Sequence, residues 1–552
     1  MKRAISLLMT ICMLLSLAAC ASSTDLARID EILDAVHAIQ EQLDSLPPDA
    51  FLPEQPPVDI NAVSYHAEDS NYRRQTRKGT LTVGMIQSEV SFDPCDSLFG
   101  AGMDLIYDPL FCIDSQGEIQ GQLAEEWAYL DATHFYIKIR YALFSNGDTV
   151  TAEDCLWSLR RFADSYSRWH ALIDFIDFDK SECISSNELV LVLKEDFGPG
   201  IRYLASDFSS VLNKDYVEAV GDAAFLDQPV GSGPYIFVPG EDGTLCTFVL
   251  RAEWAATEFA PEANTVQIRF YPDSESMLAA YEAGNLDMAF GAGGADAQRL
   301  LAGEIPDTNY VIQSSGDICS IILPEYVEAF EDLRVRRAIA MAVDWAAVRE
   351  AAMGCLCLES DSVIPDGILC KASCGTYEYD PDAAMVLLEE AGFDFGQSFE
   401  FVVDDSDASI RMAKAIQRDL LSVGINVHLG VCSWADAAER YWNGDTDLAL
   451  HSLGRPAMDP DQLFCDIAEW SDVQAFRVDT EPLPTYLEIG RWSTDDAIRE
   501  ESYRNAQSWM YESLRQIVIG QPYECYCYRP YIDTGFWCES IGMPNLRTVT
   551  FS

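Results

Sequence analysis

The sequence predicts a mixed α/β protein with more than one lobe, preceded by a helical stalk. From about residue 79, apolar segments with strand periodicity alternate with amphipathic helical patterns. The chain of 552 residues is long enough for two to four domains, and its 49% hydrophobic and 11% aromatic content is that of a folded protein. A formal net charge of −54 excludes nucleic acid as a partner, because the field around the chain repels phosphates.

The first residues have the features of an export signal, not of a folded domain. Lys2 and Arg3 precede a short apolar run that ends in Leu-Ala-Ala-Cys at Cys20. Such a run is too short to span a membrane permanently and is typical of a secretory signal. Its ending resembles the bacterial lipobox, which implies removal of residues 1–19 and lipidation of Cys20. We therefore expect a protein that is lipid-anchored at the extracytoplasmic face of the bacterial cell membrane.

Residues 20–78 are expected to form a lipidated helical stalk and a proline-rich linker. Apolar residues repeat at helical spacing over 24–46, and Pro47-Pro48 ends the pattern. Three heptads are marginal for an isolated helix, so the apolar stripe must pack against another copy or against the body of the protein. The stalk is therefore either a spacer above the membrane or a site of self-association.

Cysteine usage leaves three alternatives open. Of the 17 cysteines, Cys12 leaves with the signal and Cys20 is acylated, so an odd number remains and at least one thiol cannot pair within the chain. Two clusters stand out, Cys355/Cys357 and Cys370/Cys374. A disulfide between the clusters, inert buried thiols and a metal site are all possible, although the spacing lacks the two-residue zinc knuckle.

The elements of the globular part follow from periodicity and capping. Strands are predicted at 81–86, 134–139, 188–193, 246–250, 266–271, 286–290, 399–403, 425–429, 447–451 and 516–528. Helices are predicted at 274–283, 334–343, 381–391, 408–423 and 497–515. Thr151 and Asp154 have the spacing of a capping box, which predicts a further helix through Phe162.

The chain shows no motif for catalysis or for a cofactor. Walker, His-Glu-x-x-His, Gly-x-Ser-x-Gly and Gly-x-Gly-x-x-Gly patterns are all missing from the sequence. Gly291-Ala-Gly-Gly294 is interpreted as a loop, because no basic residue and no strand-to-helix frame accompany it. His428 is interpreted as a structural residue of a strand. We expect no catalytic residue, no cofactor, no metal and no enzymatic turnover.

Several short motifs, each weak alone, occur in a specific order between residue 79 and the C-terminus. In chain order they are Phe92-Asp-Pro94, Leu123-Ala-Glu-Glu-Trp127, Phe144 to Asp154, Gly231-Ser-Gly-Pro-Tyr235, Ala283-Gly-Asn-Leu-Asp287, Leu333 to Asp344, Tyr379 to Ala384, Leu387 to Gly392 and Asp459-Pro460. Together they resemble the family 5 solute-binding proteins of bacterial ABC importers, which include oligopeptide, dipeptide and nickel binders.

This resemblance implies a two-lobed clamp like that of periplasmic binding proteins, with an extra subdomain in the first lobe. Lobe I would comprise residues 79–315 and 522–552, and lobe II residues 316–521. Such a clamp captures its ligand by hinge closure. The resemblance also implies ABC permease and ATPase subunits as partners.

The expected ligand is a peptide or a peptide-like solute, but the sequence departs from the dipeptide pattern. Dipeptide and oligopeptide binders place an Asp four residues before the Pro of their Asp-Pro loop, where this chain has Pro456. The adjacent Arg455 suits an anionic group. The arginine that dipeptide binders place before the 408–423 helix is replaced by Val403. A carbohydrate or anionic metabolite binder and a sensor-coupled binding lipoprotein are the alternatives.

Six residues are expected to contact the ligand: Arg455, Glu89, Val90, Trp434, Tyr107 and Tyr235. Ser88-Glu89-Val90 resembles the loop that lines the cleft of oligopeptide binders, so Glu89 is an amine anchor or one more surface acid. Arg455 is a ligand group or half of a surface salt bridge, and Trp434 stacks on a ligand ring or belongs to the core. The two tyrosines are placed near the cleft by their positions in the motifs.

Overall fold

The structure is a computed structural model. It describes residues 79–552 except 87–90, 96–101, 115–117, 166–169, 241–243, 256–259, 453–458, 465–466, 468–476 and 534–544. The predicted signal, Cys20, the stalk and the linker lie outside the described residues. Glu89, Val90 and Arg455 lie outside them as well.

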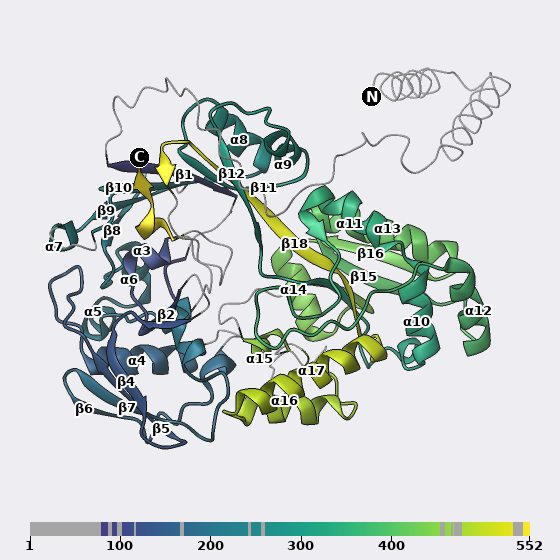
Figure 1. The fold of residues 1–552 in the computed structure, drawn as a ribbon, viewed down its shortest axis with the longest axis horizontal. Coiled ribbons are helices and arrows are strands. Elements are labelled where there is room, and N and C mark those ends of the chain that lie inside the picture. Colours follow the sequence, from purple (N-terminus) through teal and green to yellow (C-terminus); the bar gives the residue numbers. More distant parts are fainter. Residues whose placement is uncertain are drawn as a thin grey trace, which may run out of the picture. The chain divides into compact units, whose positions relative to one another are not determined.

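A single long strand, β18 (Gln516–Tyr528), connects the two halves of the main sheet (Figure 1). The sheet has 12 strands, in the order β16-β15-β17-β13-β18-β11-β1-β10-β9-β8, and β12 and β14 also pair with β18. The start of β18 pairs with β13 (Cys319–Ile322), whereas its end pairs with β12 (Asn309–Ser314) and β11 (Met288–Ala292). Nearly every residue of β18 is buried, because neighbouring strands and helices cover both its edges and its faces.

Residues 319–513 build one part of the main sheet together with its helices, and we call this part the second half. Its outer strands are parallel. Its strands beyond β13 are β14 (Cys357–Leu358), β15 (Ser398–Asp404), β16 (Asn426–Cys432) and β17 (Leu448–Ser452). Its helices are α10 (Leu333–Ala342), α11 (Trp345–Met353), α12 (Pro381–Ala391), α13 (Asp407–Ser422), α14 (Trp434–Asn443), α15 (Pro460–Leu463), α16 (Leu483–Trp492) and α17 (Asp496–Ser513). Ile339 of α10, Phe401 of β15 and Ile416 of α13 are fully buried in the core that these elements share.

The first half, built from residues 80–301, carries the remaining strands of the main sheet. These are β1 (Thr80–Ile86), β8 (Tyr235–Pro239), β9 (Leu245–Leu250) and β10 (Thr265–Tyr271), together with β11. Helices α3 (Met103–Ile106), α8 (Ser274–Glu282) and α9 (Gly294–Leu301) accompany them. The core of this half contains Val83, Phe248 and Ile268, none of which has any exposed surface.

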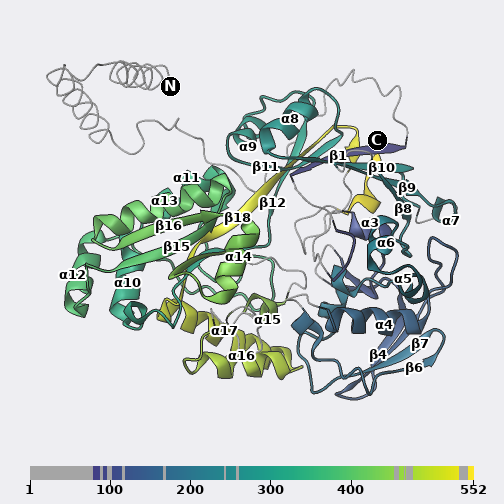
Figure 2. The ribbon, with the colours of Figure 1, turned by 180° about the vertical axis from the view of Figure 1, so that it is seen from behind.

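A separate sheet of 4 strands belongs to the first half and has its own core (Figure 2). Its strands are β4 (Ala124–Tyr129), β5 (His134–Ile139), β6 (Glu182–Ser185) and β7 (Glu188–Val192), with α4 (Ala152–Ala163) packed beside them. This sheet corresponds to the extra subdomain of the predicted fold class. The mixed α/β, two-lobed prediction is confirmed.

Local capping determines where several helices begin, as the sequence predicts for α4. The Thr151 hydroxyl accepts the Asp154 N–H at 3.2 Å, and the Asp154 carboxylate accepts the Thr151 N–H at 2.9 Å. Both members of the predicted capping box are therefore present. Within the described residues, no helix combines the length and the hydropathy that crossing a membrane requires.

One prediction from the sequence is wrong. Gly291 to Gly294 does have a strand-to-helix frame, because β11 ends at Ala292 and α9 begins at Gly294. Glycine is a poor helix former, so the sequence pattern concealed this helix start. Of the three alternatives left open for the cysteine clusters, the structure favours unpaired thiols, because Cys357, Cys370 and Cys374 are free. Burial raises the pKa of Cys357 to about 12 and that of Cys370 to about 11, so both are protonated.

The most deeply buried ion pairs fix the start of α15 to α16 and α17. Arg499 donates to both carboxylate oxygens of Asp459, at 2.8 and 3.0 Å, and Arg491 donates to Asp461 at 2.5 Å. Tyr203, from the segment that follows the four-stranded sheet, also donates to Asp461 at 2.7 Å. We call these five residues the Asp461 network. It joins the two halves of the chain through side chains that are at most 6% exposed.

We predict that Asp461→Ala destabilises the protein strongly. The substitution leaves the Arg491 guanidinium buried without its carboxylate, a loss of about 3–5 kcal/mol. As a control, Glu500→Ala breaks an exposed ion pair with Arg504 on α17 and should cost at most about 1 kcal/mol. The measurement is the apparent melting temperature of each variant at one scan rate. Equal melting temperatures for the two variants would show that the network is not a major stabilising element.

Candidate functional site

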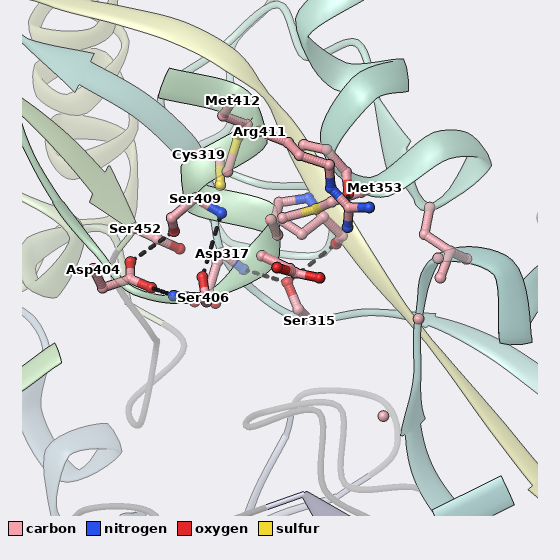
Figure 3. A pocket seen from close by; sticks show the side chains of 18 of the residues that line it. Ser315, Asp317, Cys319, Met353, Asp404, Ser406, Ser409, Arg411, Met412 and Ser452 are labelled. Carbon is pink, nitrogen blue, oxygen red and sulfur yellow. Dashed lines mark hydrogen bonds between the residues drawn. The ribbon is translucent and has the colours of Figure 1, made fainter. Parts of the chain in front are cut away.

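A cavity of about 930 Å³ lies where β18 passes between the two halves (Figure 3). The first half contributes the start of α8 (273–275) and the turn from β11 into α9 (291–295). The second half contributes the starts of α13 and α14 and the end of β17. Two connected segments, which we call the crossover segments, complete the lining: residues 315–319 and 522–524.

Four helices begin at this cavity, and side chains cap three of them. Asp273 accepts the Ser276 N–H at 2.7 Å at the start of α8, and Ser406 and Ser433 cap α13 and α14 in the same way. Helix α9 begins at Gly294, and Gly293, in its N-cap position, has no side chain to cap it. Each helix start presents N–H groups and a partial positive charge, so each can offset a negative charge placed beside it.

Carboxylates dominate the charged side chains of the lining. Among the residues that the structure describes, six carboxylates line the cavity: Asp273, Glu275, Asp317, Asp404, Asp407 and Glu524. Asp404 accepts the Ser406 N–H at 2.9 Å and the Ser409 hydroxyl at 2.6 Å (Figure 3). The hydrogen bond from the Ser276 backbone N–H is the main cause of the lowered pKa of Asp273. Hydrogen bonds at the starts of α8 and α13 thus stabilise part of this negative charge.

A guanidinium also faces the cavity, from a position that the sequence did not indicate. Arg411 lies in the second turn of α13, is exposed, and donates to the Ala352 carbonyl at 3.3 Å (Figure 3). The arginine that dipeptide binders place before this helix is replaced here by Val403, which is fully buried in the core. The signal that was missed is an arginine close to the N-terminus of a helix whose first turn lines the cavity.

The two carboxylates on the crossover segments have a different environment. The Ser315 N–H donates to the Pro522 carbonyl at 3.1 Å, which ties the segments that carry Asp317 and Glu524 together. The Tyr526 hydroxyl donates to Glu524, and burial raises the pKa of that carboxyl. Burial, followed by nearby charges that include Glu524 and Asp317, raises the pKa of Tyr526 as well. Glu524 and Asp317 therefore both contribute to the raised pKa of the buried Tyr526 hydroxyl.

Aromatic side chains give the cavity an apolar surface. Trp434 lines it from the first residue of α14 and is 65% exposed, so it belongs to the cavity and not to the core. Tyr441 and Trp442 line it from the end of the same helix, and the Tyr441 hydroxyl donates to the Val402 carbonyl at 2.6 Å. The lining can therefore contact both a charged and a ring-bearing or aliphatic group.

The predicted ligand residues divide into three groups. Trp434 lines the cavity, whereas Glu89, Val90 and Arg455 lie outside the described residues. Tyr107 and Tyr235 are buried in the core of the first half and do not line the cavity.

The loop that precedes Tyr235 explains its place in the core. A Cβ at Gly231 would lie 2.1 Å from the carbonyl oxygen of Ile106, so this glycine allows close packing of the loop against α3. The Tyr235 hydroxyl then donates to the Ala263 carbonyl at 2.8 Å. The Gly-Ser-Gly-Pro-Tyr motif therefore has a structural role in this chain.

The comparison with known protein families agrees with the two-lobed fold described above. Residues 118–473 match the model of bacterial extracellular solute-binding proteins, family 5 Middle, over more than half of the chain. The chain belongs to this family. Its members are extracytoplasmic binding proteins that work with ABC permease and ATPase subunits.

Family 5 relatives of this chain bind different solutes. Heme-binding protein A of Haemophilus influenzae is 23% identical over 71% of this chain and 76% of its own length. Di/tripeptide-binding protein 2 of Pseudomonas aeruginosa is 22% identical over 81% of this chain and 90% of its own length. The periplasmic binding protein DppA of Helicobacter pylori, solved with the peptide STSA, has a TM-score of 0.75 at 20% identity, with 86% and 98% of the two chains covered. At this identity the structural likeness shows the fold.

We predict that Glu524→Gln stabilises the ligand-free protein at neutral pH. Because burial raises the folded-state pKa above 4.5, the folded protein binds this proton more tightly than the unfolded chain does. The contribution of Glu524 to stability therefore falls as pH rises through 4.5 toward the raised pKa. The melting temperature of the variant should exceed that of the unmodified protein at pH 7, and the difference should shrink at pH 4.

The control for this measurement is Glu439→Gln, which removes an exposed acid of α14 that does not line the cavity. Its melting temperature should stay within about 1 °C of the unmodified protein at both pH values, as expected for a surface substitution. A Glu524→Gln difference that does not change with pH would contradict the assignment of a raised pKa to this carboxyl.

Proposed function

We propose that this chain is a lipid-anchored solute-binding receptor of an ABC importer, and that it captures a peptide or a peptide-like solute. The ligand would lie in the cavity beside β18 and be enclosed by closure of lobe I (79–315 and 522–552) on lobe II (316–521). The proposed hinge is the pair of crossover segments, since these carry the chain from one half to the other.

One observation carries the proposal: the cavity presents opposite charges to a ligand of peptide size. Arg411 offers a guanidinium, which suits a terminal carboxylate, and the carboxylates of the crossover segments suit an ammonium. A volume of about 930 Å³ lies within the range of small-molecule sites. The relative from Pseudomonas aeruginosa, a di/tripeptide-binding protein, supports the same ligand class.

Residues predicted from the sequence would add to this site. Trp434 would pack on a ligand side chain from its exposed place in the lining. Arg455 follows Ser452 by three residues, and Glu89 and Val90 follow Ile86 closely; both Ser452 and Ile86 line the cavity. We therefore keep Arg455, Glu89 and Val90 as proposed ligand contacts.

The remaining parts of the proposal concern the place and the mode of action of the protein. The lipid on Cys20 would hold the receptor close to its permease and raise the local concentration of loaded receptor. The stalk over residues 24–46 would act as a spacer or as a site of self-association. The receptor would bind and release its solute without making or breaking a covalent bond.

A carbohydrate or other ring-bearing solute is the second candidate ligand. The observation that favours it is the aromatic lining of α14, where Trp434 is 65% exposed and Trp442 lies close to the other end of the helix. An exposed indole stacks on a flat ligand face with a gain of about 0.5–1.5 kcal/mol beyond burial.

We predict that Arg411→Gln weakens the binding of a tripeptide about tenfold, because the terminal carboxylate loses a charge-assisted hydrogen bond. The measurement is calorimetric titration with trialanine and with its C-terminal amide. The amide should bind both proteins equally, since it has no terminal carboxylate for Arg411 to recognise.

Arg418→Gln provides the matched control on the same helix. Arg418 is 64% exposed at its side chain, bonds to Asp419 and does not line the cavity, so its loss should leave affinity unchanged. If Arg411→Gln bound trialanine as tightly as the unmodified protein, the assignment of the carboxylate site would be wrong. If trialanine and its amide both failed to bind the unmodified protein while an oligosaccharide bound, the second candidate would replace the first.

A further inference from the structure

The cavity lies where α13 and α14 leave the sheet of the second half on opposite faces (Figure 1). Phe401 of β15 and Leu448 of β17 belong to the core that α13 covers. Ala449, the next residue of β17, belongs to a different core, against which Tyr441 and Trp442 of α14 pack. Strands β15 and β17 pair in parallel, and both end at the cavity. The cavity therefore has one wall from α13 and another from α14, as is common for sites at the carboxyl ends of parallel strands.

The two walls differ in polarity. The wall from α13 is polar, with serines at the start of the helix and Arg411 in its second turn. The wall from α14 is apolar, because none of the charged residues of this helix, all of which the structure describes, lines the cavity. The residues of α14 that line it at helical spacing, and so share one face of the helix, are Trp434, Ala437, Ala438 and Tyr441.

These four residues form a recess between two rings, which we call the α14 recess. Trp434 and Tyr441 are seven residues apart in the helix, a separation of about 10 Å along its axis. Trp434 is 65% exposed, whereas Ala437 and Ala438 are at most 7% exposed although both line the cavity. The Tyr441 hydroxyl donates to the Val402 carbonyl at 2.6 Å, which holds this ring in place. The methyl groups at the base and the rings at the ends leave room for one large apolar side chain.

Filling the α14 recess with an apolar group is favourable, because the group and the exposed indole of Trp434 are both removed from water. A ring in the recess gains a further attraction from its contact with the flanking rings. A methyl group is too small to cover the indole, and a charged group would lose its hydration there. The wall from α14 therefore discriminates between ligand side chains, whereas the Arg411 guanidinium suits the carboxylate that every unmodified peptide carries.

The two walls also determine where along the ligand this side chain lies. Arg411 reaches the cavity from one face of the sheet, and the α14 recess lies on the other. The last residue of a peptide holds its side chain next to its own carboxylate, on the Arg411 side. A residue two positions earlier lies about 7 Å farther along an extended chain. The side chain that fills the recess therefore belongs to a residue before the last one.

We propose that the α14 recess binds one bulky apolar side chain of the ligand, and that the receptor thereby selects peptides with an aromatic or large aliphatic residue before the C-terminal one. This inference rests on the proposed function, because it takes the cavity to be the ligand site and Arg411 to be its carboxylate contact. Trp434 and Ala438 are the residues that determine this selection.

Calorimetric titration of the purified full-length chain with Phe-Ala-Ala, Ala-Ala-Phe and trialanine tests this selection. Phe-Ala-Ala should bind about tenfold more tightly than trialanine, as expected for the burial of one aromatic side chain. Ala-Ala-Phe should bind no more tightly than trialanine, because its ring lies on the Arg411 side. Trp434→Ala should remove most of the advantage of Phe-Ala-Ala and leave the affinity for trialanine unchanged.

A second variant fills the α14 recess from its base. Ala438→Leu should also remove the advantage of Phe-Ala-Ala, because the added side chain occupies the space of the ligand ring. The matched control is Ala435→Leu on the same helix, at an exposed position that does not line the cavity, and it should preserve the advantage. Both variants add the same side chain to α14, so a difference between them reports on the recess. The melting temperature of each variant verifies that it is folded.

The possible results separate this inference from the proposed function. Equal affinity for the three peptides would overturn the selection for an apolar side chain and leave peptide capture standing. Tighter binding of Ala-Ala-Phe than of Phe-Ala-Ala would overturn the position assigned to that side chain. If the advantage of Phe-Ala-Ala persisted in both Trp434→Ala and Ala438→Leu, the assignment to α14 would be wrong. If no peptide bound, peptide capture and this selection would both fail.

Discussion

The hydrogen bonding of β18 is the constraint on which the other features depend. Its 13 residues pair along one edge with β13 and β12 and along the other with β11 and β14, so the strand has partners in both halves of the chain. The ladder on the first edge is interrupted between Ser314 and Cys319, and this interruption produces the crossover segment that carries Asp317. The cavity therefore lies where the sheet changes from one half to the other, which is a common location for ligand sites in α/β proteins.

The placement of charge follows from the same geometry. Strands that end at the cavity are followed by helices that begin there, so four partial positive charges meet a lining rich in carboxylates. This arrangement explains how the cavity holds Asp273, Asp404 and Asp407 at little cost. Asp317 and Glu524 lie on the crossover segments, where the Tyr526 hydroxyl donates a hydrogen bond to Glu524.

The sequence predicts elements well where the local signal alone determines them. β18 and α12 occupy the predicted residues, and the Thr151 capping box starts α4. The sequence did not predict the start of α9, because glycine is a weak helix former. The folded structure nevertheless accommodates a glycine as the first residue of this helix. The site was harder to predict: whether Arg411 faces the cavity depends on how α13 packs on the sheet, and no periodicity within the helix contains that information. Tyr107 and Tyr235 lie in the core of the first half and not in the cavity lining, and the close packing of the Gly231 loop on α3 accounts for the position of Tyr235.

The Asp461 network bears on how closure would proceed. Tyr203 and the segment around Gly198 belong to the first half, yet they bond to Asp461, Arg491 and Arg499 in the second. Opening the two halves at this point would expose two ion pairs and leave the Tyr203 hydroxyl without its acceptor, a large cost for buried groups. A rotation about the crossover segments can avoid that cost if the halves separate first on the cavity side. In the proposed closure, the ion pairs would limit the range of opening, and ligand contacts would favour the closed state.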